Sequence, residues 1–261
     1  MAFIQNHQLV DGFVIAEEVI HSWRRETEGG LTVKIDFEKA YDCVDFDFLD
    51  AMMEGMGFGL RWRQWIQWCI SSSNMAVLVN GSSTLLFAIE RGLRQGDPLS
   101  PFLFNLVIKG LSHLLIKATD LGLLQGVRFG NNGLHLRHLQ FADDTIYFIK
   151  PKLDYLLHLK RILRCFDLSS GRKINFFKTY IGRMCHSARE EPCWAEALKC
   201  RKGKFPLTYL GLPLGARPSL KAFWDPVLKK VEDQLDPWKR RFLSKERHLV
   251  LIKLGLSSIP T

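Results

Sequence analysis

Two adjacent carboxylates, Asp143 and Asp144, are the residues of this sequence whose chemistry can be inferred most directly. Apolar and aromatic residues flank the pair, over residues 134–141 and 146–149, and they are types that β-strands favour. The pattern predicts a β-hairpin with two carboxylates at its tip. Two negative charges held side by side repel each other unless a cation lies between them. The pair is therefore either a solvated turn or a site for a hard metal ion.

A third carboxylate follows another predicted strand. Leu31, Val33 and Ile35 alternate with polar residues, and this period-two pattern ends at Asp36. Oxygen ligands at strand ends suit Mg²⁺, which keeps several waters and is usually completed by substrate phosphates. Two such ions can hold the attacking and leaving oxygens of a phosphoryl transfer. Asp36 and Asp143 are far apart in the sequence, so only tertiary structure can bring them together.

A loop over residues 91–101 lies between these acids and contains two arginines, a glutamine and two glycines. Glycine allows close approach of the backbone to a ligand. Ser100 is predicted to cap the following helix, with Pro101 at the first helical position. The loop is a suitable place to hold a nucleotide. The expected buried side of the helix consists of apolar residues: Phe102, Leu103, Leu106, Leu111, Leu114 and Leu115.

These segments closely resemble the polymerase motifs of reverse transcriptases from non-LTR, LINE-type retrotransposons, in particular the plant type. The resemblance covers motif A at 34–42 (KIDFEKAYD), motif B at 91–101 (RGLRQGDPLSP), motif C at 141–144 (FADD), motif D at 171–178 (GRKINFFK) and the primer-grip segment at 209–215 (YLGLPLG). Residues 224–261 are similar to the opening of the thumb. Five segments in the family's order make the resemblance specific and extend it over nearly the whole chain.

The resemblance implies an α+β fold, the right-hand polymerase palm, with an antiparallel sheet and helices on one face. It implies partial fingers over residues 1–35, a palm with inserted fingers elements over 36–215, and the start of a helical thumb over 216–261. Compared with the family, the chain would be a palm-centred fragment without an endonuclease domain or a carboxyl-terminal nucleic-acid-binding region.

The implied activity is that of an RNA-directed DNA polymerase, a nucleotidyltransferase with an RNA template, a DNA primer and dNTPs as partners. Its cofactor would be two Mg²⁺ ions, which Mn²⁺ can replace. The implied metal ligands are Asp36, the Phe37 carbonyl, Asp143 and Asp144. Lys178 matches a lysine that stabilises or protonates the leaving pyrophosphate.

Further positions match residues that contact the nucleotide and the primer. Tyr41 matches the aromatic gate under the sugar, which selects deoxynucleotides. Arg94, Gln95 and Gly96 match residues that line the incoming nucleotide, and Tyr209, Leu210 and Gly211 match the primer grip. The chain departs from the family at His7, where an arginine usually contacts the triphosphate, and at Cys43, where a basic residue is usual.

Length and charge agree with this interpretation. The chain has 261 residues, 47% of them hydrophobic, which is enough for a substantial core. Residues 1–150 hold 13 Lys and Arg against 17 Asp and Glu, a net charge of −4, whereas residues 151–261 hold 23 against 10, a net charge of +13. The acidic half contains the candidate metal ligands, and the basic half could follow a phosphate backbone.

The six cysteines contain no C-x-x-C pair and predict reduced thiols rather than disulfides. Cys185, His186, Cys193 and Cys200 are close in sequence, but their spacing fits no common zinc finger. The sequence shows no signal peptide and no apolar run of membrane-spanning length. We therefore expect an intracellular protein without a membrane partner, located in the nucleus or cytoplasm, with an organelle not excluded.

Periodicity and turn residues predict the remaining elements. The expected helices cover residues 8–25, 47–55 (capped by Asp45), 60–70 and 155–166, the last ending near Gly171, and two more follow residue 220 with a break at 236–237. Strands are expected at 76–79 and 85–90, with hairpin turns at 80–81 and 131–133. The helical spacing of Trp62, Trp65 and Trp68 favours core packing over base stacking.

Three alternatives belong to other functional classes. The chain could be a catalytically inert or nucleic-acid-binding remnant of a retrotransposon. It could resemble a group II intron maturase, although no maturase segment follows the palm motifs. It could also be an RNA-templated RNA polymerase, which Tyr41 at the gate position disfavours.

Overall fold

The computed structural model describes residues 9–38, 41–129, 134–184 and 194–216, together with residues 225, 228, 229, 232 and 233. Its helices are α1 (Leu9–Trp23), α2 (Phe46–Gly55), α3 (Leu60–Ser71), α4 (Ser100–Asp120), α5 (Leu153–Ser170) and α6 (Trp194–Leu198). The central sheet contains β1 (Gly30–Ile35), β8 (His138–Phe141), β9 (Asp144–Ile149), β10 (Tyr180–Met184) and β11 (Arg201–Lys202).

The strands of this sheet have the order β11-β10-β1-β9-β8 and pair antiparallel, except that β10 and β11 are parallel. Outside the sheet lie pairs of short antiparallel strands: β2 (Asn74–Met75) with β5 (Phe87–Ala88), β3 (Leu78–Val79) with β4 (Ser82–Ser83), β6 (Val127–Phe129) with β7 (Leu134–Leu136), and β12 (Leu207–Tyr209) with β13 (Leu212–Leu214). The α+β fold is as predicted.

The sheet separates two apolar cores, because successive residues of a strand point to opposite faces. Val33 of β1 and Tyr147 of β9 pack in the core formed with α2, α4, α5 and α6. Phe148 points the other way and packs edge-on against Trp23 of α1, with ring centres 5.7 Å apart. Most helices thus lie on one face, as predicted, while α1 and the β12–β13 pair cover the other.

The ends of several elements confirm local sequence signals. The Asp45 side chain accepts a hydrogen bond from the Phe48 N–H at 2.8 Å and caps α2. Helix α5 ends at Ser170 and is followed by Gly171 in the left-handed conformation. The turn between β3 and β4 contains Asn80 and Gly81, both with positive φ, as a tight hairpin turn requires. The strands around that turn are shorter than predicted.

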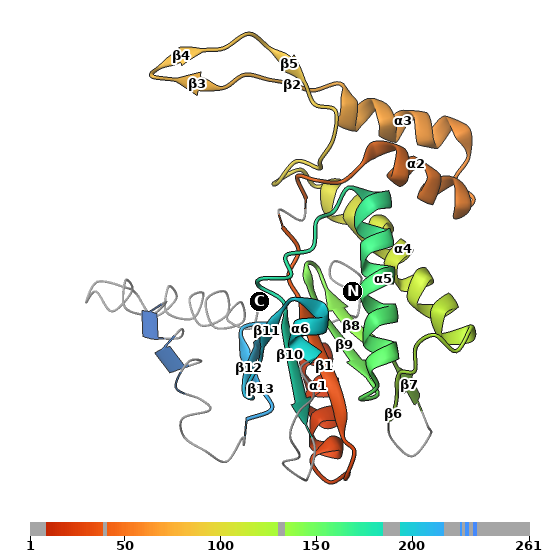
Figure 1. Cartoon of the computed structure of the whole chain (residues 1–261). Helices are drawn as coiled ribbons and strands as arrows, with labels where there is room; N and C mark the ends of the chain where they lie inside the picture. Colours follow the sequence, from red (N-terminus) through yellow and green to blue (C-terminus); the bar gives the residue numbers. More distant parts are fainter. Residues whose placement is uncertain are drawn as a thin grey trace, which may run out of the picture.

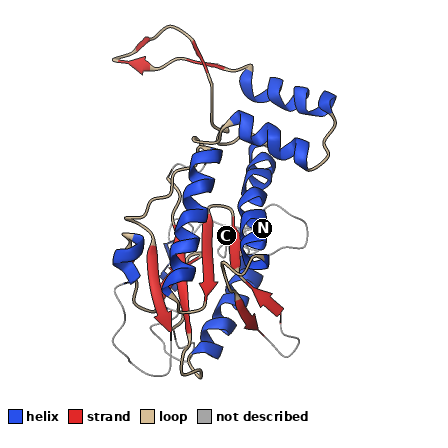
Figure 2. Ribbon diagram, turned by 45° about the vertical axis from the view of Figure 1, so that its right-hand side comes forward, coloured by secondary structure: helices blue, strands red, loops and turns tan. Residues whose placement is uncertain are grey.

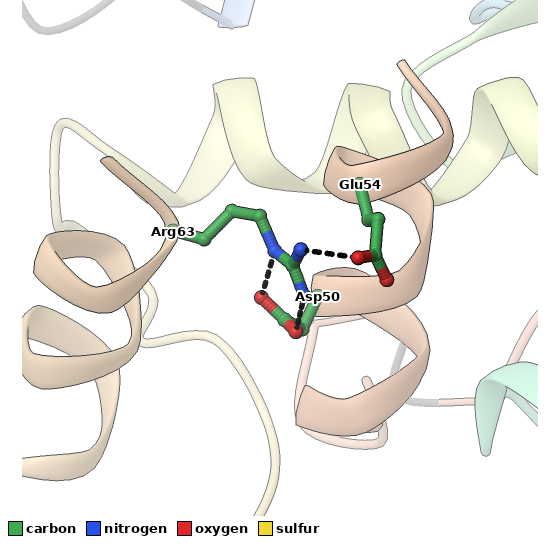
Figure 3. A network of polar contacts seen from close by, with 3 residues as sticks. All are labelled: Asp50, Glu54 and Arg63. Atoms are coloured by element: carbon green, nitrogen blue, oxygen red, sulfur yellow. Dashed lines mark hydrogen bonds and ion pairs between the residues drawn. The ribbon is translucent and has the colours of Figure 1, made fainter. Parts of the chain in front are cut away.

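Helices α2 and α3 lie beyond the end of the sheet, next to the extended hairpin of β2 to β5 (Figures 1 and 2). Arg63 joins the two helices (Figure 3). Its Nε donates to Asp50 Oδ1 and its Nη1 to Glu54 Oε1, both at 2.8 Å, and Nη2 also pairs with Asp50. The hydrogen bond from Arg63 lowers the pKa of Asp50. The inward side of α3 is therefore polar at this point.

The prediction that Trp62, Trp65 and Trp68 pack in the core is wrong. Their exposed fractions are 48%, 53% and 71%. In α3 the buried hydrophobic residue is Ile66, which lies on the same side of the helix as Arg63. Helical spacing identifies one face of a helix, but it does not determine which face contacts the protein.

Helix α4 begins differently from the prediction. Ser100 lies inside its first turn and is buried, so its predicted capping role is wrong, whereas Pro101 lies in the first turn as expected. Asp97 instead accepts a hydrogen bond from the Leu99 N–H at 2.9 Å. Phe102 and Leu114 are exposed, contrary to prediction. The buried face consists largely of Leu103, Phe104, Val107, Ile108, Leu111 and Leu115.

One helix in the described ranges, α4, has the length and hydropathy that crossing a membrane would require. Here it packs against α2 and α5 inside the domain. Its apolar length is therefore explained by its position in the core.

His138 should make stability depend on pH. Burial, together with the charge of Arg137, lowers its pKa to about 4, and its ring stacks on Tyr147 with Nε2 3.1 Å from the Ser112 hydroxyl. The unfolded chain therefore binds a proton at higher pH than the folded one. We expect the free energy of unfolding to fall by as much as about 3 kcal/mol as pH drops from 6.5 toward 4.

Urea unfolding at several pH values tests this expectation. A His138→Gln variant should lose most of the dependence in that pH range, whereas changing the exposed His135, next to this strand, to Gln should not. An unaltered profile in His138→Gln would assign the pH dependence to other groups.

Several predictions fall on residues outside the described ranges. They concern His7, the 131–133 turn, most of the helices expected after residue 220 (the five residues described there are helical), and Cys185, His186 and Cys193 of the candidate zinc cluster. Cys200 is described and has a free thiol, whose pKa burial raises to about 11. The division into fingers, palm and thumb stays a prediction, although β1, at the end of the expected fingers segment, is the middle strand of the five-stranded sheet.

Candidate active site

The three candidate acids lie at one edge of the central sheet, namely the edge formed by the ends of its strands. Ile35 of β1 pairs with Thr145 of β9, so Asp36 and Asp144 occupy the neighbouring strand ends. Phe141 pairs with Asp144 across the β8–β9 hairpin, which leaves Ala142 and Asp143 as its two turn residues. The predicted hairpin with carboxylates at its tip is therefore confirmed, and the fold brings it next to the strand that ends at Asp36.

The acids affect one another electrostatically. The pKa of Asp36 is raised, first by partial burial and also by the charges of Asp143 and Asp144, while Lys178 and Lys34 oppose the shift. Lys34 Nζ lies 3.1 Å from Asp144 Oδ1 and also donates to the Thr208 carbonyl at 2.9 Å. Either lysine charge influences the Asp36 pKa more than either neighbouring acid does, so burial is the main reason that this pKa is raised.

A pocket of about 590 Å³ opens beside Asp36. Its lining includes three basic residues from two separate segments of the chain: Arg91, Lys173 and Lys178. The pocket residues are Asp36, Phe37, Glu38, Asp42, Cys43, Arg91, Gly171, Lys173, Asn175 and Lys178. The lining includes three acids (Asp36, Glu38 and Asp42) and three basic residues, and such a cavity can hold a phosphate-bearing substrate through its basic side chains.

Asn175 fixes the relation between Asp36 and Lys178. Its N–H donates to the Asp36 carbonyl at 2.9 Å, and its Oδ1 accepts from the Lys178 N–H at 3.1 Å. The backbone N–H of Glu38 donates to the Lys173 carbonyl at 2.9 Å. These bonds flank a β-bridge between Phe37 and Ile174 and do not use the Phe37 carbonyl.

The glycine-containing loop pairs with the segment that follows Asp36. Gly92 donates to the Val44 carbonyl and Leu93 to the Tyr41 carbonyl, both at 2.8 Å. Gly92 has φ +90°, and a Cβ there would lie 2.6 Å from the Asp42 carbonyl oxygen. Only glycine fits this approach without a shift of the backbone.

The predicted nucleotide-binding residues of this loop do not line the Asp36 pocket. Arg94 Nη2 reaches the Cys69 carbonyl of α3 at 3.4 Å, while Gln95 and Gly96 are exposed. Tyr41 is half-buried and stacks on Phe104, with ring centres 4.5 Å apart. Burial, and next the charge of Asp143, raise the pKa of Tyr41. Tyr41 thus lies within electrostatic reach of the carboxylate edge.

The predicted primer-grip residues form a separate hairpin. Tyr209 ends β12, and Leu210 and Gly211 form its turn with positive φ. Tyr209 is buried, and burial, with the charge of Asp144, raises its pKa. Lys34 connects this hairpin to the acids, because it contacts both Asp144 and Thr208.

Sequence reasoning assigned no individual role to Arg91, Lys173, Asn175 or Arg172. The first three line the pocket, and Arg172 is buried beside it. The family resemblance could have identified them, because all four lie inside the motif B and motif D segments.

The carboxylates of Asp36 and Asp143 and the Phe37 carbonyl are hard oxygen donors of the kind Mg²⁺ prefers. Burial is the main cause of the raised Asp36 pKa, repulsion from Asp143 and Asp144 adds to it, and a bound cation would oppose both by favouring the charged carboxylate. Within the described ranges no three His, Cys, Asp or Glu residues form a group able to hold one ion, and Asp144 is paired with Lys34. The donor chemistry fits a divalent metal that substrate oxygens complete, with Asp144 the least available acid.

Comparison with known proteins relates this arrangement to one family. The profile described as "Reverse transcriptase (RNA-dependent DNA polymerase)" matches residues 1–214. The chain is 27% identical over 179 residues to a 149 kDa protein of transposon TX1 from Xenopus laevis, covering 67% of this chain and 13% of that protein. It is 31% identical over 134 residues to a Pol polyprotein of the type-1 retrotransposable element R2 from Popillia japonica, covering 51% and 18%.

Another relative is an uncharacterised mitochondrial protein of Arabidopsis thaliana, 50% identical over 68 residues, which cover 26% of this chain and 56% of that one. The chain thus spans less than two thirds of each of these relatives. Among solved structures, telomerase from Candida albicans aligns with a TM-score of 0.55 at 13% identity, covering 97% of this chain and 44% of that one. This likeness shows the fold alone. With its sequence profile matched over residues 1–214, the chain belongs to the reverse transcriptase family, and its relatives include proteins of non-LTR retrotransposons.

Proposed function

We propose that this chain is the polymerase palm of a retrotransposon reverse transcriptase and adds deoxynucleotides to a primer on an RNA template. The proposal rests on one observation. Asp36 lies next to the Asp143–Asp144 turn at one edge of the sheet, beside a pocket lined by Lys178 and Arg91. The acids supply metal ligands, and the cations supply contacts for a triphosphate.

The reaction joins the primer 3′-hydroxyl oxygen to the α-phosphorus of a dNTP and breaks the bond to the pyrophosphate. Two Mg²⁺ ions, or Mn²⁺ in their place, would lower the pKa of the hydroxyl and neutralise charge on the leaving oxygens. Asp36, Asp143 and the Phe37 carbonyl would hold them, and Asp144 would assist after release from Lys34.

The remaining groups position the substrates. Lys178 and Arg91 face the pocket and would bind the β- and γ-phosphates, with Lys178 donating a proton or hydrogen bond to pyrophosphate as it leaves. Tyr41 would lie under the sugar and exclude a 2′-hydroxyl. Arg94, Gln95 and Gly96 would contact the nucleotide from the neighbouring loop, and the hairpin of Tyr209, Leu210 and Gly211 would hold the primer strand.

Primer extension tests the proposal. Purified protein is incubated with an RNA template, a DNA primer, dNTPs and Mg²⁺ or Mn²⁺, beside an Asp143→Asn, Asp144→Asn double variant. We expect extension by the unmodified chain alone. Retained binding of labelled template–primer with no extension under either metal would contradict the proposal and favour a nucleic-acid-binding remnant.

A further inference from the structure

Arg172 is a charged residue buried completely inside the palm, with an exposed fraction of 0%. Its guanidinium carbon lies 4.0 Å from the centre of the Phe37 ring and 4.5 Å from that of the Phe104 ring. Among the described residues its Nε, Nη1 and Nη2 have no hydrogen-bond partner. The guanidinium is therefore held by aromatic faces, which a planar cation contacts well, rather than by acceptors.

Such an arrangement costs stability. A buried cation loses its hydration, and donors without acceptors leave that loss uncompensated. The partial balance comes from the rings and from the charge of Asp143, which opposes the lowering of the Arg172 pKa by burial. An apolar side chain of similar volume would remove the cost, because such replacements of buried ionic groups are often neutral or stabilising. Arg172 is therefore poorly explained as a stabilising residue.

The contacts of Arg172 continue to the candidate sugar gate. Phe104 also stacks on Tyr41, with ring centres 4.5 Å apart and planes 18° from parallel. Phe37, Arg172, Phe104 and Tyr41 thus form an unbroken series of planar contacts, which we term the Arg172 column. Its members come from the segment after β1, the segment after α5, helix α4 and the segment before α2.

The backbone that carries Arg172 and Tyr41 has little freedom. Gly171 precedes Arg172 with φ +72°, and a Cβ at Gly171 would lie 2.5 Å from the Cys43 carbonyl oxygen. Leu93 donates to the Tyr41 carbonyl at 2.8 Å. With the backbone fixed next to Arg172 and at Tyr41, the position of the Tyr41 ring depends on the side chains that fill the space between them.

We propose that Arg172 is a positioning residue that sets the place of the Tyr41 ring and, through it, the preference for deoxynucleotides over ribonucleotides. The inference rests on the function proposed above, which gives Tyr41 its contact with the sugar. Arg172 itself touches no substrate. It acts through Phe104, so the loss of either member of the column should loosen the gate in the same way.

Nucleotide selectivity is the first test. The ratio of kcat/KM for a dNTP to that for the matching rNTP is measured for the unmodified chain, Arg172→Leu, Phe104→Leu, the double variant and Tyr41→Ala. We expect Arg172→Leu to lower the ratio by at least about tenfold, toward the value for Tyr41→Ala. Phe104→Leu should do the same, and the double variant should lose little more, because both changes break one column.

Stability and a matched arginine separate positioning from ordinary packing. Arg183 also lies over an aromatic ring, 5.6 Å from the centre of Trp194, but outside the column. Arg183→Leu should leave the ratio unchanged. Arg172→Leu should unfold thermally at or above the temperature of the unmodified chain. A lower unfolding temperature with an unchanged ratio would overturn the proposal, since that is the result of a merely structural role.

A second readout does not need catalysis. In protein labelled with ¹³C-tyrosine, a Tyr41→Phe variant identifies the Tyr41 ring signals in the NMR spectrum. We expect these signals to move in Arg172→Leu and Phe104→Leu but not in Arg183→Leu. Unmoved signals would overturn the inference whether or not the chain extends primers. Moved signals in a protein that extends no primer would leave the column intact and defeat the proposed polymerase function instead.

Discussion

Changing Asp36 or Asp143 to asparagine is expected to lower kcat for primer extension at least about a hundredfold while the protein remains folded. Each change keeps the side-chain shape but removes the negative charge that would hold a divalent metal. The folded state already disfavours charge at Asp36, since burial and then Asp143 and Asp144 raise its pKa. The Asp36→Asn variant should therefore be no less stable than the unmodified chain, whereas its activity should be lost.

The measurement pairs single-nucleotide extension rates with urea unfolding for each variant. Asp154→Asn, which alters an exposed acid in the first turn of α5, is the matched acid-to-amide control. It should extend primers at the unmodified rate. Asp144→Asn should be impaired less than Asp143→Asn, because Lys34 already engages Asp144. Full activity in Asp36→Asn would remove this residue from the catalytic set.

Changing Gly92 to alanine is expected to destabilise the protein by roughly 2–5 kcal/mol, through a strained positive φ and through overpacking against the Asp42 carbonyl. The added Cβ would lie 2.6 Å from that oxygen, and the neighbouring atoms are backbone, which cannot rotate away. Because Gly92 and Leu93 bond to Val44 and Tyr41, the strain would separate the loop from the segment that follows Asp36.

Gly57 is the matched control for this substitution. It has φ +84°, similar to Gly92, but no atom lies within 4 Å of a Cβ built there. Gly57→Ala should therefore cost only the conformational term, about 1–2 kcal/mol. Urea titration of both variants compares their free energies of unfolding. Equal losses would show that the approach to Asp42 contributes nothing beyond backbone conformation.

Local patterns predicted those parts of the site that depend on local geometry. The alternation that ends at Asp36 and the apolar flanks of Asp143 are properties of single strands. Strands β1 and β9 formed as expected, whereas the apolar run before Asp143 is divided into β7 and β8. Helix α5 ends before Gly171 because glycine adopts the left-handed conformation that closes a helix more easily than other residues do. The family resemblance predicted that Asp36 and Asp143 lie close together in the fold. The spacing of these residues in the sequence could not predict this.

Other features depended on contacts that no local pattern contains. The tryptophans of α3 have the spacing of a buried stripe, yet Arg63 and the carboxylates of α2 determine which side of the helix faces inward. Arg172 would be placed on the surface from its charge alone, since buried arginines are rare. Its burial follows from contacts with the rings of Phe37 and Phe104, two residues remote in sequence.

The hairpin of β2 to β5 has a consequence for how the protein behaves at high concentration. No charged residue occurs from 72 to 89, and within this stretch Leu78, Leu85 and Leu86 are 73%, 92% and 71% exposed. Segments that combine exposed apolar side chains, unpaired strand edges and no charge are prone to edge-to-edge association. The overall charge of +9 should keep dilute molecules apart, but added salt screens that repulsion and leaves the hairpin's attraction in place. We therefore expect any self-association at moderate ionic strength to arise from this uncharged hairpin rather than from the rest of the fold.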